Sequence, residues 1–264
     1  MNLAKSPNLT MNIELTKLSP AERVLWSLGI TDPIDIDLDA IAFHLGATVK
    51  RRRLDGCEAR LVGAGDKAII TIDSQSIPTR QRFSVAHELG HWKLDRGRGG
   101  FLCTKDDINL RDGSVRDGEA IANSFASQLV LPDYLFDPLA IGKPITFDAA
   151  EKIAGIFSTS LTATAIKLVK NAAVAAWLVC HHQRGMAWFF KSQFAPGDLY
   201  LRKELHQDTE GFERLFGTVG ARTRVKLESG SLWFSSRDAS RYQVKVQSTK
   251  AMDGTVLSIV SLTK

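Results

Sequence analysis

Two histidines spaced four residues apart constrain this chain most, since residues 83–91 read Phe-Ser-Val-Ala-His-Glu-Leu-Gly-His. On a helix, His87 and His91 lie one turn apart on the same face, so both imidazoles can reach one metal ion. Glu88 is offset from His87 by about 100° around the axis, where a general base can act on a water held by that ion. The flanks are mostly apolar, which argues against a pair of surface histidines. The segment predicts a Zn²⁺ centre, and Mn²⁺ tolerates the same ligands.

A catalytic zinc site uses three protein ligands, so one more has to come from elsewhere in the chain. The remaining histidines, at positions 44, 181, 182 and 206, lie outside the region around the motif. Leu94 and Gly97 stand where an extended HExxHxxGxxH motif needs its glycine and its third histidine. Glu119 opens the alanine-rich stretch 119–126, whose small side chains let a helix pack closely on the first one. Asp117 is the rival, but it falls in a predicted loop. We therefore predict that Glu119 completes the ligand set.

The composition is that of a globular protein, with 264 residues, 44% of them hydrophobic and 24% charged. It excludes a disordered, collagenous or coiled-coil chain. The three cysteines are far apart and form no CxxC pair, which excludes a disulfide framework and a cysteine zinc site. No apolar run approaches the roughly 20 residues of a membrane span. The expected location is the cytoplasm, without a membrane partner.

The net charge of +5 is unevenly distributed along the chain. Residues 200–264 carry 11 Lys and Arg against 7 Asp and Glu, whereas residues 1–199 carry 23 against 22. The dense basic run at 50–53 is most simply a solvated strand end. Direct nucleic-acid binding is therefore possible but not favoured, and it concerns mainly the C-terminal region.

Hydrophobic periodicity and turn signals predict an α+β fold. Three short strands indicate a small antiparallel sheet, and the chain becomes β-rich after residue 171. Helices are expected at 21–28, 38–45, 79–95, 118–131, 148–157 and 161–170, and strands at 48–53, 58–62, 68–73, 173–180, 186–191, 231–235, 242–247 and 255–262. We divide the chain into a flexible tail (1–18), a domain with the predicted metal centre (19–171) and a β-rich accessory or regulatory domain (172–264). The second contains a helix-turn-helix-like hairpin at 147–170.

Residues 80–91 read Arg-Gln-Arg-Phe-Ser-Val-Ala-His-Glu-Leu-Gly-His, and residues 119–132 read Glu-Ala-Ile-Ala-Asn-Ser-Phe-Ala-Ser-Gln-Leu-Val-Leu-Pro. These segments resemble the ImmA/IrrE-type metallopeptidases, a likeness that extends over residues 20–170. The resemblance implies a thermolysin-like zinc peptidase domain in which His87, His91 and Glu119 hold the metal and Glu88 is the general base. It also implies a protein substrate, a helix-turn-helix transcriptional repressor whose site-specific cleavage relieves repression in a stress or mobile-element response. Asn123 departs from some related zinc peptidases, which place a carboxylate there.

Three more residues are candidates for substrate binding. Arg60 and Leu61 lie in the strand 58–62, which as an edge strand could pair with an extended substrate and hold its carbonyl at the metal. An ordinary solvent-facing edge strand is the alternative. Tyr134 follows the Glu119 helix and could hydrogen-bond an oxyanion, although a tyrosine at the edge of the core is the default.

The hairpin at 147–170 has two interpretations. A DNA-binding hairpin places basic and polar residues on an exposed second helix. Lys167 and Lys170 are the only basic residues in the second helix, so a structural hairpin is favoured.

Two functions from other classes remain open. A DNA-binding or protein-docking regulator with a structural metal predicts salt-dependent DNA affinity and indifference to Glu88→Gln. A toxin–antitoxin partner that binds a toxin without hydrolysing it predicts co-purification of an uncut protein. The peptidase hypothesis predicts instead that Glu88→Gln keeps the metal and abolishes cleavage. The sequence gives no prediction of the oligomeric state.

Overall fold

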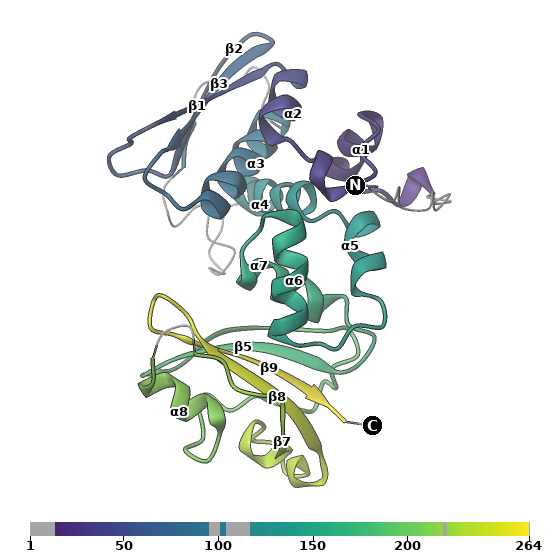
Figure 1. The fold of residues 1–264 in the computed structure, drawn as a ribbon, viewed down its shortest axis with the longest axis vertical. Coiled ribbons are helices and arrows are strands. Elements are labelled where there is room, and N and C mark those ends of the chain that lie inside the picture. The colour runs from purple at the N-terminus through teal and green to yellow at the C-terminus, as the bar shows by residue number, and fades with distance from the viewer. Residues whose placement is uncertain (1–13, 95–100, 104–116, 219–220, 264) are drawn as a thin grey trace, which may run out of the picture.

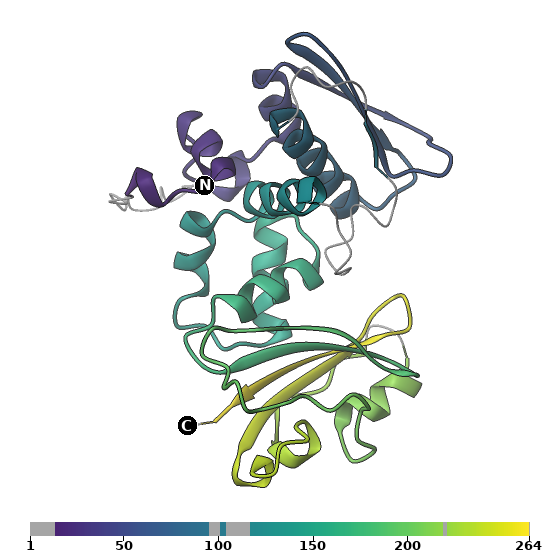
Figure 2. The ribbon, with the colours of Figure 1, turned by 180° about the vertical axis from the view of Figure 1, so that it is seen from behind.

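The computed structural model describes residues 14–94, 101–103, 117–218 and 221–263. Three tiers follow one another along the long axis: a small sheet with its helices, a central group of helices, and a larger sheet that carries the C-terminus (Figure 1). The view from behind shows the same order (Figure 2). The predicted mixture of helices with a β-rich C-terminal part is confirmed. Residues 1–13 of the predicted tail lie outside the described residues, whereas Leu18 is already buried.

The helices of the first two tiers agree closely with the expected ranges, apart from one that was not predicted. That helix is α5, which begins directly after Pro132 and contains Pro138. The helices are α1 (Pro20–Ser27), α2 (Leu38–His44), α3 (Pro78–Leu94), α4 (Asp117–Val130), α5 (Asp133–Ala140), α6 (Phe147–Phe157) and α7 (Leu161–Lys170). Within the described part of the chain, no single helix combines the length and the apolar character of a membrane span.

The small sheet is mixed, and the prediction of an antiparallel sheet is wrong for its first strand. It consists of β1 (Ala47–Arg52), β2 (Ala59–Ala64), β3 (Lys67–Asp73) and β4 (Phe101–Cys103), in the order β1-β3-β2-β4. β1 runs parallel to β3, and β2 runs antiparallel to both β3 and β4. β3 lies between β1 and β2, so the turn after β1 does not close a hairpin. Alternating hydrophobicity assigns the two faces of a strand but not its neighbours.

α6 and α7 form the predicted helical hairpin. Each begins with a side-chain cap, from Thr146 to the amide of Ala149 and from Ser160 to the amide of Ala163. The two helix axes are bent by 115°. Six consecutive residues of α7, 164–169, are buried because α7 packs against α6, β5 and β6. α7 is therefore a core helix, as the structural interpretation predicts.

The larger sheet is antiparallel throughout, in the order β6-β5-β9-β8-β7. Its elements, with the helix α8 that precedes β7, are β5 (Ala176–His182), β6 (Gly185–Lys191), α8 (Glu210–Phe216), β7 (Lys226–Ser229), β8 (Gln243–Lys250) and β9 (Val256–Leu262). The strand expected at 231–235 is wrong. Gly230–Leu232 form a 3-10 turn, and the turn places the next residues, Trp233 and Phe234, in the core. Burial of an apolar run does not require it to be a strand.

One hydrophobic core crosses the predicted domain boundary near residue 172. Leu178 and Cys180 of β5 and Ile259 of β9 belong to the same buried cluster as residues of α3, α4 and α7. The other face of β5 packs into a second cluster through Trp177 and Val179. β5 is thus buried on both faces, which explains its nearly unbroken apolar sequence. The larger sheet is attached to the helices through shared packing.

Candidate metal centre

The predicted ligands of the motif lie on one face of α3. His87 and His91 are one turn apart, with only 0% and 2% of their surfaces exposed. Phe83, one turn earlier, continues the same stripe, and its ring centroid is 6.5 Å from that of His87. α3 is held in place by packing against β2 and β3 on one side and α4 on the other. The two imidazoles therefore sit at the interface between two helices.

Glu119 in the first turn of α4 meets both histidines. The Nε2 atoms of His87 and His91 are 3.0 Å apart, and each lies 3.2 Å from Oε2 of Glu119. A tetrahedral ion with bonds of about 2.0 Å needs donor atoms about 3.3 Å apart. The three atoms therefore fit around one small cation, and their chemistry, two imidazoles and a carboxylate, suits Zn²⁺.

Asn123 orients the first of these ligands. Its Oδ1 lies 3.0 Å from Nδ1 of His87. Because an amide oxygen only accepts hydrogen bonds, this contact places a proton on Nδ1 and a lone pair on Nε2. An amide therefore supports the ligand here without adding negative charge beside the site.

α3 and α4 approach closely at the centre because both carry small residues there. A Cβ on Gly90 would lie 2.9 Å from Cα of Ala122 and 3.0 Å from its carbonyl oxygen. Ala122 and Ala126 are fully buried on the facing side of α4. The close packing predicted from the alanines is confirmed, and it brings Glu119 within reach of the histidines.

Glu88 is fully buried on α3, immediately beside the first ligand. No further His, Cys, Asp or Glu joins His87, His91 and Glu119 within the ranges that the structure describes. Asp117, the rival ligand, is the first residue of α4, and its side chain falls outside the described residues. Two imidazoles and one carboxylate are a ligand set that catalytic zinc sites use, and a carboxylate beside such a set is where a general base can act.

The two arginines of the motif connect α3 to its surroundings. Arg80 Nε lies 3.7 Å from Oε2 of Glu58, a buried carboxylate that also accepts a hydrogen bond from Ser76. Arg82 donates a hydrogen bond from Nη2 to the carbonyl of Ile36, 2.8 Å away. Both contacts support the start of the helix that carries the histidines.

The structure corrects the predicted roles of Arg60 and Leu61. β2 is not an edge strand, because β3 pairs with one side of it and β4 with the other, and Arg60 and Leu61 stand opposite Leu102 and Phe101. Leu61 is also part of the core. The backbone of these residues is therefore already paired with the chain itself. β4 falls in a stretch whose polar sequence predicted a loop.

Tyr134 is also placed differently from the prediction. Its hydroxyl donates a hydrogen bond to the carbonyl of Ile30, 2.7 Å away, and its ring packs edge-on against Trp26. Burial, together with the Glu22 carboxylate, raises the pKa of this hydroxyl. The hydroxyl has one proton, which it donates to the carbonyl of Ile30, so Tyr134 does not donate to an oxyanion at the metal centre. The default interpretation of a core-edge tyrosine applies.

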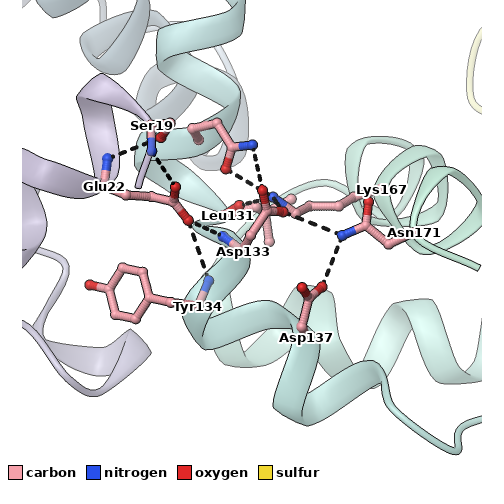
Figure 3. A network of polar contacts seen from close by, with 9 residues as sticks. Ser19, Glu22, Leu131, Asp133, Tyr134, Asp137, Lys167 and Asn171 are labelled. Atoms are coloured by element: carbon pink, nitrogen blue, oxygen red, sulfur yellow. Dashed lines mark hydrogen bonds and ion pairs between the residues drawn. The ribbon is translucent and has the colours of Figure 1, made fainter. Parts of the chain in front are cut away.

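A second polar cluster, partly buried, lies at the other end of α4 (Figure 3). Lys167 of α7 contacts the carboxylate of Asp133 at 2.6 Å, the side chain of Gln128 at 3.2 Å and the carbonyl of Leu131. Asn171 donates hydrogen bonds to Asp133 and Asp137. The cluster joins α4, α5 and α7.

The same cluster extends to α1 through Glu22. This buried carboxylate caps α1 by bonding the amide of Ser19, and it also accepts from the amides of Asp133 and Tyr134 at the start of α5. Sequence reasoning missed this cluster. Ser-x-x-Glu at 19–22 is the signature of a capping box, but nothing in it indicates the bond to α5.

Residues 40–168 match the profile of a peptidase family described as the IrrE N-terminal-like domain. No curated protein sequence matches the chain. Solved structures of similar fold include a Mycobacterium tuberculosis transcriptional regulator, with a TM-score of 0.58 and 11% identity over 92% of this chain and 75% of that one. At this identity the likeness concerns the fold alone. The profile match covers both helices that carry the predicted ligands. Residues 40–168 thus form an IrrE N-terminal-like domain, which supports the likeness to the ImmA/IrrE-type metallopeptidases.

Proposed function

We propose that the protein is a cytoplasmic, zinc-dependent endopeptidase of thermolysin-like arrangement that cleaves a helix-turn-helix transcriptional repressor at one or few sites. Cleavage would relieve repression in a stress or mobile-element response. One observation carries the catalytic part: three donor atoms of His87, His91 and Glu119 converge within 3.2 Å, with the carboxylate of Glu88 buried beside them. The match to this domain family supports peptidase chemistry.

The residues divide the chemistry between them. A bound Zn²⁺ polarises a carbonyl group and lowers the pKa of a water molecule. Glu88 accepts a proton from the attacking water and delivers it to the leaving amine. Its burial keeps bulk water away from the base, so the proton passes to the product side. Asn123 holds the His87 ring in the orientation that points Nε2 at the ion.

The repressor part of the proposal is tested by cleavage in solution. The purified full chain, loaded with zinc, is incubated with the helix-turn-helix repressor encoded nearest to it, with and without a chelator. The proposal expects one discrete fragment that is absent with chelator and restored by Zn²⁺ or Mn²⁺. An intact repressor under every trigger condition would overturn the proposal. A tight complex with an uncut partner would favour the toxin–antitoxin alternative, and salt-dependent DNA binding that ignores Glu88→Gln would favour the structural-metal regulator.

A further inference from the structure

A hollow of about 510 Å³ adjoins the metal centre on the side of α7 and β6. Two of its lining residues are Phe83, on the ligand stripe of α3, and Ala120, which follows Glu119. A third is Asn123, the partner of His87. The hollow is far larger than the packing voids of a protein interior. It therefore begins one helical turn from the metal ligands and provides room beside them.

Charge in the hollow is unequally balanced. Lys167 and Lys170 of α7 both line it, and Asp133 is the one acidic side chain among its described lining residues. Asp133 is already bonded to Lys167 at 2.6 Å. Lys170 makes a different contact, with its Nζ 4.8 Å from the ring centroid of Phe190. In the described part of the chain, no carboxylate forms an ion pair with Lys170. One positive charge in the hollow is left over.

We propose that this hollow receives an acidic side chain of the substrate a few residues from the scissile bond, and that Lys170 is the residue that selects it. The inference rests on the proposed peptidase function. The methylene groups of a glutamate can lie against Phe190, while its carboxylate meets the ammonium of Lys170. Lys170 is exposed at the rim of the hollow, and partial desolvation of its ammonium together with the neighbouring Lys167 lowers its pKa, an effect that an incoming carboxylate opposes. A basic substrate side chain at this position would meet two lysines and is disfavoured.

The test measures binding, so that it does not depend on turnover. Peptide hydroxamates that chelate zinc are prepared with a glutamate, glutamine or lysine about three or four residues from the chelating group. An extended peptide of that length covers the distance from Asn123 on α4 to Leu131, which directly follows the helix. Their dissociation constants are measured on the zinc-loaded full chain, on Lys170→Met and on Lys152→Met. Lys152 is an exposed lysine of α6 that does not line the hollow, so its variant controls for the loss of one charge.

The expected result is that wild type binds the glutamate probe about fivefold more tightly than the glutamine probe, with the lysine probe weakest. Lys170→Met should remove this preference and Lys152→Met should keep it. Equal affinities in wild type, a preference that survives in Lys170→Met, or no hydroxamate binding at all would overturn the inference. Repressor cleavage separates the two proposals. Cleavage without probe discrimination removes only the role of Lys170, and discrimination without cleavage removes only the peptidase function.

Discussion

The two ends of α4 hold polar clusters of different construction. At the C-terminal end, the ammonium of Lys167 meets the Asp133 carboxylate, the Gln128 side chain and a backbone carbonyl, so donors face acceptors. At the N-terminal end, three ligand atoms of His87, His91 and Glu119 face one another at 3.0–3.2 Å. The first group, the Lys167 cluster, pairs a cation with acceptors of the chain itself. The second group, the metal-centre cluster, brings together three side chains that can all be ligands of one cation.

The largest effect should come from removing a ligand of the metal-centre cluster, which consists of His87, His91 and Glu119. His87→Ala should weaken zinc binding more than about a hundredfold, since loss of a supporting contact alone costs 10- to 100-fold. Because zinc binds only the folded chain, a chelator should lower the melting temperature of wild type but not of this variant. Zinc content and melting temperature are measured together. His44→Ala, at an exposed histidine of α2, is the control, and a His87→Ala protein that retains zinc would break the comparison.

Removing the ammonium group of Lys167 should change the stability of the fold and not the affinity for zinc. Lys167→Met leaves Asp133 without its ionic partner and should lower the free energy of unfolding by about 2–3 kcal/mol, because the Asp133 side chain is 40% exposed and water compensates in part. Zinc content per folded molecule should stay unchanged. Denaturant unfolding with and without chelator measures both. Equal loss of metal affinity and stability would show that the two clusters are not distinct.

The pH dependence of that variant sharpens the test. Burial opposes ionisation of Asp133, but the Lys167 charge and hydrogen bonds from Lys167, Gln128 and Asn171 outweigh it and lower the pKa of this carboxyl group. A lowered pKa in the folded state contributes stability above the unfolded value of 3.8, which is lost as the pH falls through the folded value. The stability difference between wild type and Lys167→Met should therefore be full at neutral pH and shrink below about pH 4. A difference that grows in acid would contradict this account.

Asn123 lines the same hollow as Lys167, but its side chain contacts His87, so its substitution should change the affinity for zinc. Asn123→Ala removes the acceptor for Nδ1 of His87 and should weaken zinc affinity about 10- to 100-fold with little change in the stability of the zinc-free protein. Asn123→Asp, which keeps an acceptor, should restore most of the affinity. Competition with a zinc-binding dye gives the constants. Equal zinc affinity in wild type and Asn123→Ala would show that the contact does not support the ligand.

The smallest changes in stability should come from two glycine substitutions. One tests the contact between α3 and α4, and the other tests helix propensity alone. Gly90→Ala forces a Cβ to within 2.9 Å of Ala122 and should destabilise the protein by about 1–2 kcal/mol, while also weakening zinc binding. Gly155→Ala on α6 has no atom within 4 Å of its new Cβ and should stabilise the protein by about 0.5–1 kcal/mol. Thermal unfolding of both variants is the measurement. A stabilised Gly90→Ala protein would mean that α3 and α4 are not in close contact at the centre.

The same contrast explains how much could be predicted from the sequence. Residues on one helix face have a fixed spacing, so His87 and His91 could be placed together, and the alanines after Glu119 indicated a helix that packs closely. The Lys167 cluster could not be predicted. Lys167 and Asp133 are 34 residues apart, and the bend between α6 and α7 brings them together. From the sequence alone, Lys167 looked like an ordinary basic residue on an amphipathic helix.

Tertiary pairing also accounts for the incorrect predictions. The faces of β1 and β2 follow from alternation, but β3 lies between them, and β4 covers the backbone of Arg60 and Leu61. α5 was not predicted, and it contains Pro138, which removes one backbone donor from this short helix. Tyr134 lies at the start of that helix, and its hydroxyl bonds to Ile30, which is remote in sequence. The errors at the strands and at Tyr134 share one cause: local sequence patterns do not specify which distant segment will pack or pair with a residue.

Glu88→Gln tests the central claim, a catalytic metal centre with Glu88 as its base, most directly. The substitution keeps the size and burial of the side chain but removes the base, and general base catalysis contributes about 10²- to 10⁴-fold to rate. Zinc content, melting temperature and repressor cleavage are measured on the same preparation of wild type and variant. The account predicts one bound zinc and an unchanged fold in both proteins, with cleavage lost only in the variant. A zinc-loaded Glu88→Gln protein that cleaves at the wild-type rate would contradict it.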